Sequence, residues 1–244
     1  MQPSRAFFDL QLRFADRVAA LTGLLLEDAL LDYTNLYIRF GLGRAFDRMH
    51  PVWRAYADGL HTMPDISAWT LHFYRTHAQE TPPPHTAGTF GCFRYADESD
   101  DLIRLHFQYA DLTGAAALGI ERMSARLAEL RTLFMHIAHN RPQTRRVAGT
   151  SWLYHLADYR RLFPDAYLAS ATVAPARFRN MPLWGQFLDR HGDVRPHPAA
   201  QLIERVARVT HPDDLAACFP LQPLALEAPV DAFYAFHRVP VSAR

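Results

Sequence analysis

Hydrophobic positions in the first third of the chain repeat at the spacing of α-helices. Over residues 4–22 the apolar side chains recur every three or four positions, and Gly23 ends the repeat. Similar patterns cover residues 24–40 and 65–77, and prolines interrupt the stretch between these two. We therefore expect a helical layer, and we assign it to residues 1–80 as the first of two parts of the chain.

The pattern changes after a run of prolines that favours an extended connector. Apolar and polar residues alternate over 89–95 and over 102–109, with a polar turn between them, which predicts a β-hairpin. The elements expected beyond it are a helix over 118–139, a strand over 145–153, a helix over 156–163, a strand over 167–173, helices over 182–190 and 198–209, a short helix from 212, a strand over 221–226 and a last helical turn over 230–236. This alternation predicts an α/β fold, in which helices cover a mixed sheet over residues 85–244.

Composition narrows the classes of function. The 244 residues are 49% hydrophobic and carry a formal net charge of +1, which suits one large or two small domains and argues against nucleic acid or an anionic membrane as partner. No apolar run approaches the roughly 20 residues that a membrane span requires, and the N-terminus lacks the features of a signal peptide. Two cysteines make no disulfide framework, so we expect a cytoplasmic protein.

All 26 residues of the lysine-plus-arginine count are arginine. The absence of lysine excludes Schiff-base and pyridoxal-phosphate enzymes, Walker A nucleotide sites and Ser–Lys dyads. Any anion must then be held by arginine, by backbone N–H groups or by a helix N-terminus. The pairs at 145–146 and 160–161 fit a phosphate contact, although a solvated face is the usual explanation of such pairs.

Ser151 is a candidate nucleophile because small residues precede it at the end of an expected strand. The G-x-S-x-G elbow of hydrolases needs small residues on both sides of the serine, whereas Trp152 and Leu153 follow here. The alternative is that Ser151 ends the strand or caps the next helix, with Trp152 in the core. A serine hydrolase is accordingly the third of our hypotheses.

His106 and Glu227 are candidate general bases. If Leu105 and Phe107 face the core, His106 and Gln108 share the other face of the strand, where His106 lies in solvent or in a cleft. Glu227 follows an apolar run and is either a base or the exit of a strand to solvent.

The chain contains 13 histidines, but their spacing predicts no metal site. His136 and His139 are three residues apart on an expected helix, so both can lie on one face. A metal site needs a third ligand, and the sequence contains neither H-E-x-x-H nor C-x-x-C. The pair also fits the C-terminus of a helix, where a positive charge is favourable.

Three short motifs in a fixed order resemble a known family. A Leu-His step at 105–106 precedes the long helix, Ser-Trp-Leu at 151–153 ends the next strand, and Leu-Phe-Pro follows at 162–164. In this order they resemble an uncharacterised bacterial family of acyltransferase-like proteins with a helical first half and a GNAT-like C-terminal domain. The family has two leucines where this chain has Leu153 and Tyr154.

The resemblance implies an acyl thioester such as acyl-CoA as cofactor. Working GNAT enzymes hold the pyrophosphate of coenzyme A with an Arg/Gln-x-x-Gly-x-Gly/Ala loop at a helix N-terminus, and this chain has no such motif. The nearest small-residue loop precedes the long helix, and Asp111 within it is unfavourable for a phosphate. Its candidate backbone donors are Leu112, Thr113, Gly114 and Ala115.

Two functions from different classes follow from these patterns. The first is an acyltransferase-like protein in which His106 or Glu227 takes a proton from an attacking amine. The second, favoured by the missing phosphate loop, is a non-catalytic GNAT-like module that binds a protein partner or forms a homodimer. The sequence identifies no substrate for either.

Overall fold

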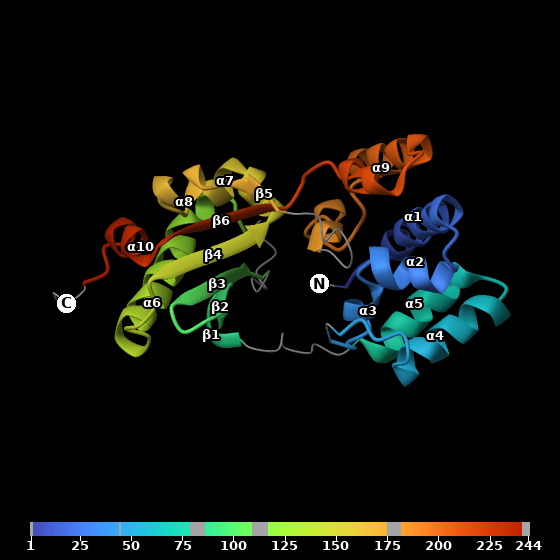
Figure 1. Ribbon diagram of the computed structural model, residues 1–244, viewed down its shortest axis with the longest axis horizontal. Helices are drawn as coiled ribbons and strands as arrows, with labels where there is room; N and C mark the ends of the chain where they lie inside the picture. The colour runs from blue at the N-terminus through green and yellow to red at the C-terminus, as the bar shows by residue number, and fades with distance from the viewer. Residues whose placement is uncertain (1, 44, 79–85, 109–116, 175–181, 241–244) are drawn as a thin grey trace. The chain divides into compact units, whose positions relative to one another are not determined.

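The computed structural model describes residues 2–43, 45–78, 86–108, 117–174 and 182–240 (Figure 1). The chain forms two compact units, one of Met1–Pro83 with Pro175–Gln222 and one of Pro84–Ala174 with Pro223–Arg244. The division expected from the sequence placed everything after residue 85 in one part, whereas residues 175–222 group with the N-terminal helices. Among the described helices, none is long and apolar enough to cross a membrane.

The first compact unit, which we call the helical unit, consists of helices and one isolated β-bridge, Leu188–Val194, over its described residues. Its elements are α1 (Arg5–Thr22), α2 (Leu26–Tyr33), α3 (Leu36–Arg39), α4 (Pro51–Thr62), α5 (Ile66–His77), the 3-10 helices η3 (Pro182–Phe187) and η4 (Pro212–Cys218), and α9 (Pro196–Arg208). As expected, α1 ends at Gly23, which adopts a φ of 73° that favours glycine. Helix α4 was not predicted, because Pro51 begins this helix rather than breaking it.

The single helix expected over 24–40 is two helices, α2 and α3. The Thr34 hydroxyl donates to the Leu30 carbonyl and accepts from the Leu36 N–H at 3.3 Å, a donor that would bond the carbonyl four residues back in a continuous helix. The Asn35 N–H donates to Gln11 Oε1 of α1 at 3.1 Å. Polar side chains therefore stabilise the break.

Aromatic rings fill the core of the helical unit. The indole of Trp184 in η3 is fully buried and meets the rings of Phe7 and Phe14 edge-on, at centroid distances of 6.5 and 5.4 Å. Its Nε1 donates to the Tyr33 carbonyl at 3.2 Å. These contacts explain why a segment far along the sequence belongs with the first helices.

The second compact unit, the sheet unit, confirms the mixed α/β class. Its elements are β1 (Thr86–Phe90), β2 (Phe93–Asp97), β3 (Leu102–Phe107), η1 (Ile120–Arg122), α6 (Met123–Asn140), β4 (Arg146–Ser151), η2 (Trp152–His155), α7 (Ala157–Arg160), α8 (Asp165–Ala169), β5 (Thr172–Val173), β6 (Leu224–Pro229) and α10 (Val230–Phe236). The strand order is β1-β2-β3-β4-β6-β5. The pair β3–β4 is parallel, and the other neighbours are antiparallel.

Three predicted elements of the C-terminal half differ in the structure. Residues 167–173 form the end of α8 and the two-residue β5 rather than one strand, because Pro164 and Asp165 start a helical turn there. The helix expected over 182–190 is the 3-10 helix η3. The strand expected over 221–226 begins after Pro223 and extends to Pro229.

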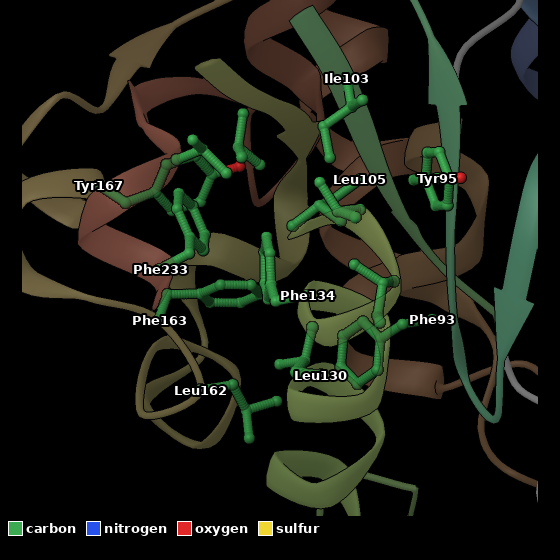
Figure 2. Packing of buried hydrophobic residues seen from close by; sticks show 14 of the residues in the cluster. Phe93, Tyr95, Ile103, Leu105, Leu130, Phe134, Leu162, Phe163, Tyr167 and Phe233 are labelled. Carbon is green, nitrogen blue, oxygen red and sulfur yellow. The ribbon is translucent and has the colours of Figure 1, made fainter. Parts of the chain in front are cut away.

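One face of the sheet carries the hydrophobic core of the sheet unit. Side chains that alternate along β2 and β3 pack with α6, and Figure 2 shows Leu130 and Phe134 of α6 among them. Residues of η2, α7, α8 and α10 join the same cluster. The helices of this unit thus bury a single face of the sheet.

Gly149 of β4 lies against two buried phenol groups. The hydroxyls of Tyr154 and Tyr167 hydrogen-bond each other at 2.8 Å, and a Cβ at position 149 would overlap both. Burial raises the pKa of both phenols well above the usual value, so both stay protonated.

We expect Gly149→Ala to lower the free energy of unfolding by about 1–3 kcal/mol, because its methyl group must displace the hydroxyl pair. Urea unfolding followed by circular dichroism measures the loss. Tyr167→Phe removes one of the two oxygens, so it should make the alanine less costly. Equal costs in the two backgrounds would show that the hydroxyls are not the obstacle.

His237, after α10, is a buried histidine without a hydrogen bond to either ring nitrogen among the described residues. It stacks on Phe134 with a centroid distance of 5.3 Å, and its Nε2 has no partner. Burial lowers its pKa from 6.5 to about 4.

This pKa makes stability depend on pH. Above about pH 6.5 the ring is neutral in both states, and at lower pH the unfolded chain takes up the proton first. We expect the free energy of unfolding to fall by up to about 3 kcal/mol from this group as the pH drops from 6.5 to 4. His237→Phe should remove that part of the pH dependence. Parallel curves for variant and wild type over this range would contradict the assignment.

Candidate functional site

The parallel strands β3 and β4 separate at their carboxyl ends. Their pairing runs from Leu102 opposite Arg146 to Leu105 opposite Gly149. Beyond this point β3 stays paired with β2 as far as Phe107, and β4 stays paired with β6 as far as Ser151. Ligands of open α/β sheets bind outside the carboxyl ends of strands, so this divergence is the candidate site.

Strand alternation places polar side chains on the sheet face opposite the core. Leu105 is buried and Phe107 packs against the core, as expected, so His106 points to the other face. His106 is half-buried and lies directly opposite Arg94 in the β2–β3 ladder. Arg94 Nη1 donates to Gln108 Oε1 at 2.8 Å, which confirms that Gln108 shares this face.

Arg104 connects the two strands where they begin to separate. Its Nη2 donates to Glu98 Oε2 at 3.0 Å, and its Nε bonds the other oxygen of the same carboxylate. Its Nη1 donates to the Thr150 hydroxyl at 2.8 Å. These hydrogen bonds lower the pKa of Glu98, which therefore stays ionised near neutral pH.

Glu227 occupies the same polar face at a distance from His106. It pairs with Ala148 in the β4–β6 ladder, so it lies two strands, or about 10 Å, from the β3 backbone. Its carboxylate accepts from Arg146 Nη1 at 2.8 Å, and both side chains are 45% exposed. The sheet thus does not bring the two candidate bases together, and Glu227 is held by an ion pair.

Ser151 ends β4 and caps η2. Its hydroxyl oxygen accepts from the Leu153 N–H at 3.1 Å, which is the alternative considered for it. Trp152 is half-buried rather than part of the core. A role of Ser151 as nucleophile stays a prediction.

The remaining candidate positions are placed as follows. The backbone donors proposed for phosphate, Leu112, Thr113, Gly114 and Ala115, lie outside the described residues. His136 Nε2 hydrogen-bonds the Tyr95 hydroxyl at 3.1 Å. Over the described ranges, no group of three or more His, Cys, Asp or Glu side chains could hold a metal ion.

Two residues of this face were missed in the sequence. Arg104 is two positions before His106, so alternation alone places both on one face. The contact of Thr150 with Arg104 could not be predicted in this way, because it depends on the register between β3 and β4.

We find no match to this chain among protein families, curated proteins or solved structures.

Ser151→Ala should lower the free energy of unfolding by about 1 kcal/mol, because the Leu153 N–H loses its acceptor. Chemical denaturation measures this cost. Treatment with a fluorophosphonate probe should label neither wild type nor variant. Labelling of wild type that the substitution abolishes would instead identify Ser151 as a nucleophile.

Proposed function

We propose that the sheet unit transfers an acyl group from a thioester such as acyl-CoA to an amine. The observation that carries the proposal is the divergence of β3 and β4, with His106 on the polar face beside it. The Leu-His motif that resembles GNAT-like proteins lies on β3, and the Ser-Trp-Leu motif starts at the last residue of β4 and continues into η2. An acyltransferase needs a place where a donor and an acceptor meet, and we assign it to the point where the pairing of β3 with β4 ends.

His106 is the base that the geometry favours. The amine nitrogen attacks the thioester carbonyl carbon, the C–S bond breaks, and the thiol leaves after protonation. His106 takes the proton that the amine loses. Glu227 is less suitable, because it faces Arg146 and lies away from the divergence.

Arg104 positions the strands in this scheme. Its bond to Thr150 joins β3 to β4 beside the last paired residues, and its bonds to Glu98, in the turn between β2 and β3, hold the guanidinium in place. The backbone N–H groups of residues 112–115 would bind the pyrophosphate of the donor just before the long helix.

Calorimetry with CoA and acetyl-CoA tests donor binding, and release of thiol in the presence of a mixture of primary amines tests transfer. We expect CoA to bind, and His106→Gln to retain binding but slow thiol release by about 100-fold or more. His139→Gln provides a matched control, since His139 is exposed at the end of α6.

Absence of CoA binding at millimolar concentration would overturn the proposal, and so would equal transfer rates in the His106 and His139 variants. The non-catalytic alternative, a GNAT-like module for a protein partner or a homodimer, would then be tested by light scattering.

A further inference from the structure

Arg39, at the end of α3, is a partly buried cation that has no carboxylate partner in the described part of the chain. Its guanidinium lies over the ring of Phe7, 5.4 Å from the ring centroid. No ion pair or hydrogen bond joins its side chain to any described residue. Burial lowers its pKa, and the Tyr74 phenol has a smaller opposing effect. Because a buried charge is costly unless it is paired, this position is suited to an anion.

The surroundings of Arg39 are fixed by two contacts between α1 and α3. Phe7 lies under the guanidinium, and one turn further along α1 the Gln11 Oε1 accepts from the Asn35 N–H at 3.1 Å. Asn35 is one turn before Arg39, whose N–H donates to the Asn35 carbonyl at 3.0 Å. Side chains one turn apart are about 5–6 Å from each other. We call these four residues the Arg39 seam.

Two further polar groups of the Arg39 seam lack partners. Gln11 is fully buried and Asn35 is 9% exposed. Gln11 Nε2 and Asn35 Oδ1 are buried and make no hydrogen bond with any described residue. Buried groups that make no hydrogen bond are costly. The Arg39 seam thus contains a cation, Arg39, a donor, Gln11 Nε2, and an acceptor, Asn35 Oδ1, that a ligand could satisfy.

We propose that the Arg39 seam binds a small monocarboxylate that carries a hydroxyl group beside its carboxyl group. The guanidinium fork and the Gln11 Nε2 donor suit a carboxylate. Asn35 Oδ1 can only accept, so it selects a ligand that has an O–H or N–H. A single positive charge favours a monoanion, because a dianion would leave a buried net charge. The site is independent of the acyl transfer proposed for the sheet unit.

Thermal unfolding of the full chain tests the proposal, with lactate, propionate and the neutral propionamide as probes at matched ionic strength. We expect lactate to raise the midpoint by about 3–6 °C at ten times the dissociation constant. Propionate should have a smaller effect and propionamide none. Quenching of tryptophan fluorescence gives a second readout, since the Phe7 ring also contacts Trp184.

Three variants assign the effect to the seam. Arg39→Met should abolish the shift, whereas Arg13→Met, an exposed position of α1, should respond as wild type does. Gln11→Glu keeps the acceptor for the Asn35 N–H and adds a carboxylate near Arg39, so it should raise the midpoint by itself and remove the ligand response. If Arg39→Met does not fold, the ligand response of Gln11→Glu is the test of the proposal. No shift of the wild type with any carboxylate, or an undiminished shift in Gln11→Glu, would overturn the proposal.

Discussion

The four-residue parallel ladder between β3 and β4 is the interaction on which the sheet unit depends. On one side of it β1, β2 and β3 form an antiparallel ribbon, and on the other β4, β6 and β5 form a second. A parallel pair needs a crossover connection, and α6 lies in that connection and packs on the buried face. The two ribbons therefore share one core while their polar ends are free to separate.

The position of the divergence follows from what lies on each face. On the buried face Gly149 leaves room for the hydroxyls of Tyr154 and Tyr167, so β4 approaches this layer closely at the last paired position. On the polar face Arg104 reaches from β3 to Thr150. The end of the ladder is thus supported from both faces, and such support is what a binding site on a rigid scaffold requires.

The sequence predicted the mixed α/β class because the period of its hydrophobic pattern changes from helical to alternating near residue 85. It also predicted which way His106 points, since alternation within one strand is a local property. It failed where distant segments decide the outcome. Tyr167 is β-like in its local pattern but lies on a helix under the sheet, and η3 joins the first helices because Trp184 fills their aromatic core.

The chain contains arginine but no lysine. The partner of each buried guanidinium group indicates whether the group serves the fold or is available to a ligand. In the sheet unit a carboxylate accompanies several arginines that are buried or half-buried, as Glu129 does for Arg126 and Glu98 for Arg104. In such a pair the carboxylate neutralises the guanidinium, so little charge is left to bind a ligand. The guanidinium of Arg39 contacts the ring of Phe7 instead of a carboxylate. An aromatic ring offsets less of the desolvation cost of a partly buried cation than a carboxylate does. The anion that we propose for the Arg39 seam would offset the rest of that cost.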